Sequence, residues 1–236
     1  PRGIAGLIVP ANTPIANIAW KTFPALICGN TVVLKSAEDS PSIANLFAQI
    51  TKDAGLPDGV FNVLQGLGKT AGAALVEDDR VDIISFTGST EVGRWIAETC
   101  GRRLARVSLE LGGKNPNIIF SDCDFDQMLK TTLQSSFANQ GQICLCGSRI
   151  LVERSIYNRF LKFFILKTKE LRIGPPSDIN TQIGAIVSSD HRDKILSCIQ
   201  LAKDEGGIIE CGGVSVNLGG ENSGGYFVAP TIITGL

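Results

Sequence analysis

The stretch that decides the fold runs from residue 61 to residue 100 and reads "FNVLQGLGKTAGAALVEDDRVDIISFTGSTEVGRWIAETC". It contains two strand-like runs, at 61–66 and 82–88, and a segment with helical character follows each of them. Alternation of strands and helices at this spacing is typical of βαβ units, whose strands lie parallel. The stretch therefore predicts a parallel sheet covered by helices.

The same alternation extends toward the N-terminus. Residues 3–9 and 30–35 read as strands buried on both faces, and the segment between them looks helical until Pro24 interrupts it. Residues 40–55 form a well-signalled helix. The expected apolar face of that helix consists of Ile43, Leu46, Phe47 and Ile50. These patterns predict a doubly wound α/β domain over residues 1–112.

A second α/β domain is expected over residues 113–236. Residues 106–120 are two strand runs interrupted by glycines and a proline, which is typical of a domain junction. An amphipathic helix at 124–140, a strand at 149–154 and a long helix at 155–171 follow. The chain opens directly on strand-like sequence without a Met, so we expect both domains to be truncated, the first at its N-terminal side and the second at its C-terminal side.

Composition excludes several classes of protein. Of the 236 residues, 44% are apolar and 19% charged, which is ordinary for a soluble globular chain. The net charge of −1 and the scattered Lys and Arg argue against a nucleic-acid partner. No apolar run approaches the roughly 20 residues of a membrane helix, and no secretory signal opens the chain. Seven irregularly spaced cysteines indicate reduced thiols and a cytoplasmic protein.

Two cysteines, Cys144 and Cys146, lie in the polar stretch "FANQGQICLCGSR" at 137–149. A metal site needs about four ligands, and the chain offers no second cysteine pair at ligand spacing and a single histidine. We therefore predict no metal site. A disulfide across one residue would be strained. The remaining interpretations are two small core residues or a nucleophile.

The general base for such a nucleophile is not obvious. The single histidine, His191, lies at the polar start of an expected surface helix, which disfavours a cysteine–histidine hydrolase. Glu110 has apolar neighbours, and burial would raise the pKa of its carboxyl toward that of a general base. Simple alternation would instead place Ser108 and Glu110 on a solvated face. The pattern leaves both interpretations open.

The chain resembles the aldehyde dehydrogenase superfamily. Its two signature motifs match "LELGGK", which contains Glu110, and "GQIC", which ends at Cys144, 34 positions later. "VPANTP", "GNTVVLKSAEDSP" and "ISFTGSTEVGR" resemble further motifs in the same order, so the resemblance covers the whole chain. The residues around Cys144 are most similar to members that act on muconic semialdehydes.

The resemblance implies oxidation of an aldehyde to a carboxylic acid with NAD as hydride acceptor. Cys144 would attack the aldehyde carbon and form a thiohemiacetal and then a thioester, with Cys146 a bystander. Glu110 would activate the hydrolytic water. The side-chain amide of Asn12 and the backbone N–H of Cys144 would stabilise the oxyanion. Lys21 matches a lysine near the proton path of the family, although a helix-surface lysine would fit the same position.

The resemblance also implies a cofactor site. Lys35 and Glu38 match the pair that holds the adenosine ribose, and a carboxylate there favours NAD over NADP. The helix after Gly88 would meet the pyrophosphate with its free N–H groups. The implied cofactor contacts are Lys35, Glu38, Gly68, Phe86, Gly88, Ser89, Val92, Gly93 and Leu111.

Some residues depart from the family pattern. Ala11 precedes Asn12 where an aromatic residue is common, and Thr13 follows it, which alters the expected substrate tunnel. Family members are about twice as long, and the parent protein is expected to be a homo-oligomer, a dimer or a tetramer. Two alternatives stay open: a CoA-acylating relative, against which Glu110 argues, and a non-catalytic nucleotide-binding relative.

Overall fold

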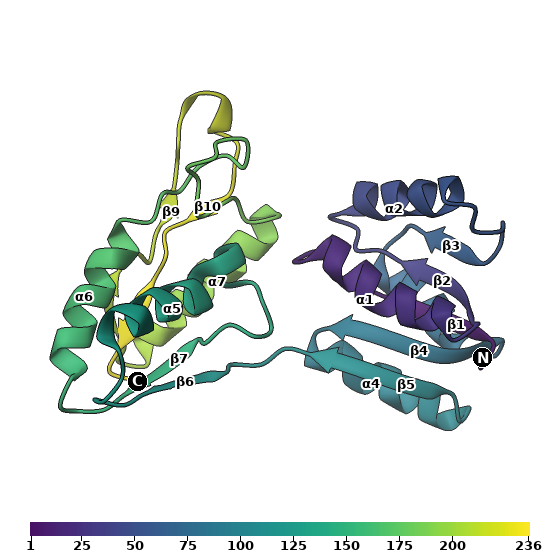
Figure 1. Cartoon of the computed structure of the whole chain (residues 1–236), viewed down its shortest axis with the longest axis horizontal. Coiled ribbons are helices and arrows are strands. Elements are labelled where there is room, and N and C mark those ends of the chain that lie inside the picture. Colours follow the sequence, from purple (N-terminus) through teal and green to yellow (C-terminus); the bar gives the residue numbers. More distant parts are fainter. The chain divides into compact units, whose positions relative to one another are not determined.

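The structure is a computed structural model that describes residues 1–236 (Figure 1). The chain divides into two compact units, Pro1–Gly112 and Gly113–Leu236. None of the helices combines the length and the apolar character that a membrane crossing requires.

The first unit is built on a five-stranded sheet in the order β3-β2-β1-β4-β5. The strands are β1 (Ile4–Ile8), β2 (Thr31–Lys35), β3 (Phe61–Leu64), β4 (Val81–Gly88) and β5 (Arg106–Leu111). All four neighbouring pairs are parallel. The order reverses between β1 and β4, which is where doubly wound sheets open a crevice at the carboxyl ends of their strands. The predicted fold class is confirmed.

Helices cover both faces of this sheet. They are α1 (Pro14–Ile27), α2 (Pro41–Asp53), a π-helical turn (Gly68–Gly72) that continues into α3 (Ala73–Glu77), and α4 (Thr90–Arg102). Side chains of α1 and α2 pack with one set of strand residues, and side chains of α3 and α4 pack with another. The two clusters lie on opposite faces because the strands are buried on both sides.

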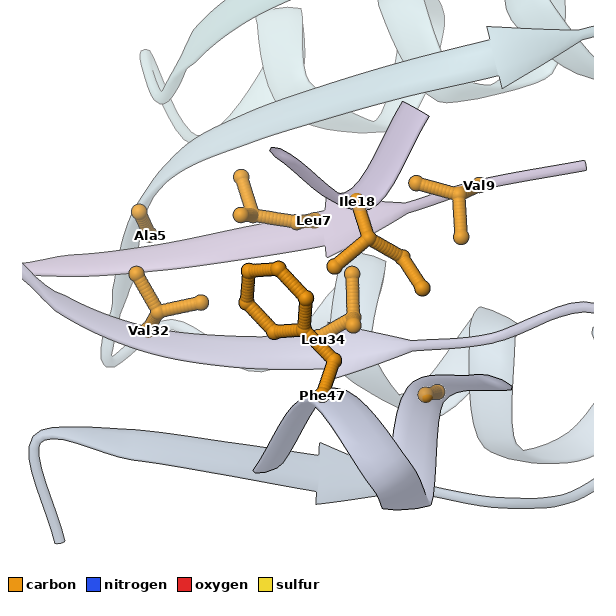
Figure 2. Packing of buried hydrophobic residues seen from close by; sticks show 8 residues of the cluster. Ala5, Leu7, Val9, Ile18, Val32, Leu34 and Phe47 are labelled. Carbon is orange, nitrogen blue, oxygen red and sulfur yellow. The ribbon is translucent and has the colours of Figure 1, made fainter. Parts of the chain in front are cut away.

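The cluster under α1 and α2 shows why these segments fold as they do (Figure 2). Leu7, Val32 and Leu34 point from β1 and β2 toward Ile18 of α1 and Phe47 of α2. Val32 and Leu34 are 0% exposed. Burying an apolar side chain of this size stabilises the fold by roughly 1.5–3 kcal/mol, so this cluster helps to hold both helices on the sheet.

Two sequence expectations about these helices are wrong. Pro24 does not interrupt α1, which continues to Ile27. Pro24 is exposed, so solvent can reach the carbonyl that loses its helical partner. In α2 only part of the expected apolar face is buried, since Leu46 and Ile50 are 58% and 55% exposed. Phe47 of the expected face is buried as predicted, and Ala44, which was not expected, is buried beside it, because the helix contacts the sheet along a narrower stripe.

The second unit contains shorter sheets. Two parallel strands, β6 (Pro116–Ile119) and β7 (Arg149–Val152), pair with each other. The helices α5 (Phe125–Phe137) and α6 (Tyr157–Lys169) pack together around the stacked rings of Phe160 and Phe164, whose centroids are 5.1 Å apart. The remaining elements are a 3-10 turn (Ala138–Gly141), α7 (Ser189–Asp204), β8 (Ile208–Cys211) paired with β11 (Ile232–Thr234), β9 (Ser215–Val216) paired with β10 (Phe227–Val228), and a second 3-10 turn (Gly220–Asn222).

Candidate active site

The candidate residues of the first unit gather at one edge of its sheet. Asn12 follows β1, Glu38 follows β2, and Gly68 follows β3, while Ser89 and Glu110 lie at the ends of β4 and β5. Because all five strands are parallel, their carboxyl ends meet at the same edge. Residues that are nearly 100 positions apart in the chain are thereby brought to one side of the unit.

A cavity of about 580 Å³ opens at this edge. Six of the nine residues predicted to contact a cofactor line it, namely Lys35, Glu38, Gly68, Phe86, Gly88 and Val92. The apolar wall and the few convergent polar groups are typical of a small-molecule site. The volume lies within the usual range of roughly 300–1,000 Å³ for ligand pockets.

The other three predicted contacts do not line the cavity, and two other roles are visible for them. Ser89 caps α4, since its hydroxyl oxygen accepts from the N–H of Val92 at 3.3 Å. Gly93 allows close packing between α4 and β5, because a Cβ at this position would come within 2.5 Å of Leu111 Cδ2. These residues position the start of α4 rather than forming the wall of the cavity.

Sequence reasoning missed several wall residues. Trp95 and Ile96 of α4 line the cavity, as do Leu67 and Val76 near the π-helical turn. Trp95 follows Val92 by three positions, so both project from the same face of the helix. This spacing could have been used to predict Trp95 as a wall residue once Val92 was assigned to the site. The π-helical turn offers no comparable pattern.

Lys35 and Glu38 form an ion pair in the cavity wall. The Lys35 ammonium donates to Glu38 Oε2 at 2.7 Å, and the lysine side chain is 3% exposed while the glutamate side chain is 47% exposed. Partial burial acts to raise the pKa of Glu38, but the hydrogen bond and charge of Lys35, with backbone N–H groups that include that of Gly68, outweigh it and lower the pKa. Glu38 is therefore held as a carboxylate that can accept hydrogen bonds from hydroxyl groups.

Asn12 lies on a short, restrained loop between β1 and α1. Its neighbours Pro10 and Pro14 restrict the backbone on both sides. The amide of the buried Asn17 reaches back to the same loop and donates to Thr13 Oγ1 at 2.7 Å and to the Thr13 carbonyl at 3.1 Å. The loop that carries Asn12 is thus fixed by covalent restraint and by hydrogen bonds.

Glu110 is exposed on β5, an edge strand of the sheet. The interpretation of Glu110 as a buried carboxyl does not hold for this structure, because the residue is exposed on a strand whose single neighbour in the sheet is β4. Lys21 is half-buried and donates to Ser85 Oγ at 2.8 Å, so it is not a surface lysine. Burial lowers the pKa of Lys21, although the nearby Glu110 carboxylate acts in the opposite direction.

In the second unit, Cys144 and Cys146 differ in exposure. Cys144 is exposed and Cys146 is buried. Both belong to a turn of residues 143–146 that is closed by a hydrogen bond from the Cys146 N–H to the Ile143 carbonyl at 3.0 Å. Before this turn, three residues in succession adopt left-handed backbone conformations, with φ of 50°, 56° and 71° at Asn139, Gln140 and Gly141. The chain reverses sharply after α5 and presents Cys144 at the surface of the unit.

Two features of the chain remain, the single histidine and the possibility of a metal site. His191 lies in the first turn of α7, where its backbone N–H donates to Ser188 Oγ at 3.3 Å. No group of three or more Cys, His, Asp or Glu side chains is arranged to hold a metal ion.

A parallel sheet of this strand order, with a cavity at the carboxyl ends of its strands, places the first unit in the class of doubly wound α/β folds. Within that class, the sequence model of the Aldehyde dehydrogenase family matches residues 1–236, and the chain belongs to this family. The predicted resemblance to the aldehyde dehydrogenase superfamily is thereby confirmed.

Individual relatives agree with this assignment. The chain is 48% identical over 238 residues to 2-aminomuconic semialdehyde dehydrogenase from Danio rerio, a match that covers 100% of this chain and 49% of the relative. It is 46% identical to human retinal dehydrogenase 2 over 99% of this chain and 44% of the relative. The crystal structure of PnpE in complex with nicotinamide adenine dinucleotide matches with a TM-score of 0.95 at 40% identity, over 99% of this chain and 48% of that chain. The chain thus spans about half the length of the relatives it matches.

Proposed function

We propose that this chain is part of an NAD-dependent aldehyde dehydrogenase that oxidises an aldehyde to a carboxylic acid. The observation that carries the proposal is the exposed Cys144 on its turn, in a chain that belongs to the aldehyde dehydrogenase family. Glu110 at the family's base position favours hydrolysis over transfer of the acyl group to CoA. The complete protein is proposed to be a cytoplasmic homo-oligomer.

The first unit is proposed to bind NAD, and its residues fit that group. The Glu38 carboxylate can accept from ribose hydroxyls, and the N-terminus of α4 beside Gly88 offers unpaired N–H groups to a pyrophosphate. Phe86, Val92 and the apolar wall would enclose an adenine ring. When bound, NAD supplies the acceptor for the hydride that leaves the substrate carbon. The second unit is proposed to supply the nucleophile.

The proposed chemistry begins at the thiolate of Cys144. Its sulfur forms a bond to the aldehyde carbon, and the π electron pair moves onto the carbonyl oxygen. The amide of Asn12 and the N–H of Cys144 would stabilise that oxyanion. Collapse of the thiohemiacetal expels hydride and leaves a thioester on Cys144. Glu110 then takes a proton from water, which attacks the thioester, releases the acid and restores the thiol.

Semialdehydes with a second polar group are the proposed substrate class. Three of the relatives are named 2-aminomuconic semialdehyde dehydrogenase, from Danio rerio, Mus musculus and Homo sapiens. The small residues Ala11 and Thr13 on either side of Asn12 leave more room beside that amide than an aromatic residue would. A panel of semialdehydes and of long apolar aldehydes, compared by kcat/KM with the complete protein, tests this assignment.

The two cysteines provide the direct test of the proposed nucleophile. In the complete protein, Cys144→Ala should abolish NADH formation from an aldehyde, because no covalent intermediate can form. The matched variant Cys146→Ala removes a neighbouring thiol of the same kind and should keep most of the activity. Full activity in Cys144→Ala would end the assignment of Cys144 as the nucleophile.

A further inference from the structure

One side chain outside the predicted site makes two contacts with the turn that carries Cys144. The amide nitrogen of Asn115 donates to the carbonyl oxygen of Cys144 and also to that of Cys146, the latter at 3.1 Å. An amide NH₂ has two hydrogens, so a single Asn can serve both acceptors. Asn115 directly precedes β6, and its own carbonyl accepts from the Arg149 N–H at 3.1 Å where β7 begins. Its backbone is therefore held by the strand pair.

The same turn fixes the direction of the Cys144 N–H. The Ile143 carbonyl points into the turn, where it accepts from the Cys146 N–H. Because the peptide bond is planar and trans, the N–H of Cys144 points opposite to that carbonyl and thus out of the turn. With Asn115 bound to two further carbonyls, three of the four carbonyl groups in the turn have fixed partners.

We propose that Asn115 is a positioning residue for the reaction of Cys144. It holds the turn so that the outward N–H of Cys144 stays directed at the oxygen of the reacting carbonyl. This inference rests on the proposed function, because it assumes that Cys144 attacks an aldehyde. Asn115 acts through the backbone of the turn and touches neither substrate nor cofactor in this scheme.

A purely structural role for Asn115 predicts a different pattern of effects. Attack on an aldehyde develops negative charge on the carbonyl oxygen and needs the N–H donor. Alkylation of the same thiolate by iodoacetamide displaces iodide at a saturated carbon and develops no such oxyanion. A positioning residue should therefore affect the first reaction far more than the second, whereas general loosening of the fold should affect both.

Asn117 provides a matched control two positions along. It is also a half-buried Asn at the beginning of the same strand, and its amide donates to Thr132 Oγ1 of α5 at 3.0 Å instead of to the turn. Asn115→Ala and Asn117→Ala should be made in the complete protein. For each, the rate of the NADH burst is measured by stopped flow with a saturating aldehyde. The rate of alkylation of the peptide that contains Cys144 is measured by mass spectrometry.

Asn115→Ala should lower the burst rate by about 10- to 100-fold, below the full ~10²–10³-fold loss typical of deleting an oxyanion donor. Its alkylation rate should stay within about twofold of the native rate, and Asn117→Ala should keep both rates. An unchanged burst rate, or a parallel fall of burst and alkylation, would overturn the positioning role.

A second variant keeps the proposal testable if Asn115→Ala folds poorly. Asn115→Ser retains one shorter donor and should give a burst rate between those of the native protein and Asn115→Ala; a burst rate at or below that of Asn115→Ala would count against the proposal. Activity that survives Cys144→Ala would instead overturn the proposed function itself. The failure of the proposed function and the failure of the positioning role are therefore distinguishable.

Discussion

Glu38, which lines the cavity of the first unit, is proposed to set the preference between NAD and NADP. Its pKa is lowered by Lys35, so the side chain is negative throughout the neutral range. A second negative group on the ribose, as in NADP, would be repelled by this carboxylate. We expect kcat/KM to be higher with NAD than with NADP. Glu38→Gln should reduce the difference between the two values without reversing the preference. Equal or better use of NADP by the native protein would contradict the placement of Glu38.

Glu110 can be tested separately from the nucleophile. If it activates only the hydrolytic water, Glu110→Gln should leave thiolate attack and hydride release intact and slow deacylation by about 10²–10⁴-fold. The complete protein should then give a burst of about one NADH per working site, followed by a slow steady rate. Intact-mass measurement should find the acyl group on Cys144. Loss of both the burst and the adduct would instead assign Glu110 to the thiol.

Some of these site residues could be predicted from the sequence and others could not. Cys144, Glu110 and Glu38 followed from motif resemblance, because reactive groups recur in short, recognisable stretches. Periodicity alone could not decide whether Glu110 is exposed, since that depends on which elements cover β5. Asn115 was not predicted at all. Its contacts with the turn at 143–146 span about 30 residues of sequence and leave no local pattern.

At the scale of elements, the packing of α4 requires a close approach to β5 at Gly93. A Cβ at Gly93 would lie 2.5 Å from Leu111 Cδ2, a distance that real Cβ atoms essentially never show, so the Leu111 side chain would have to move. Gly93→Ala should therefore destabilise the first unit by about 1–3 kcal/mol through overpacking. Gly101 in the same helix meets nothing within 4 Å, so Gly101→Ala should be neutral or stabilising by roughly 0.4–1 kcal/mol. Urea unfolding of the two variants measures the difference, and equal stabilities would contradict the packing argument.

Most strands and helices could be predicted because their patterns are local. The strand runs and the αβ alternation of residues 61–100 match β3, α3, β4 and α4 closely. The errors concern exposure. Leu46 and Ile50 have the spacing of a core stripe, yet which part of a helix meets the sheet depends on neighbours that the sequence of the helix does not contain. That α1 continues through Pro24 could not be predicted for the same reason, because it depends on the exposure of Pro24 in the folded unit.

At the scale of the whole molecule, the seven free cysteines should separate into reactive and protected sets. Cys28, Cys144 and Cys198 are exposed, whereas Cys100, Cys146 and Cys211 are buried and Cys123 is intermediate. Burial also raises the pKa of Cys100 and that of Cys211. Because the thiolate is the nucleophile, these two thiols should react more slowly still at neutral pH and gain reactivity as the pH rises.

Peptide-level mass spectrometry after brief alkylation checks this expectation. The three exposed cysteines should be labelled first, and denaturant should make all seven equally reactive. Rapid native labelling of Cys100 would contradict the packing of α4 against the sheet, since Cys100 is 0% exposed in that cluster.

The strand order of the first unit also has a consequence for synthesis. The central strand, β1, precedes the other four strands of this sheet in the chain, and its second partner, β4, starts at Val81, 46 positions after β2 ends at Lys35. At roughly 5–20 residues per second, a ribosome needs about 2–9 s to make that interval. During this time one side of an apolar strand has no native partner, and such an edge invites pairing with other chains. The speed of translation through residues 36–80 therefore sets how long each nascent chain is exposed to that risk.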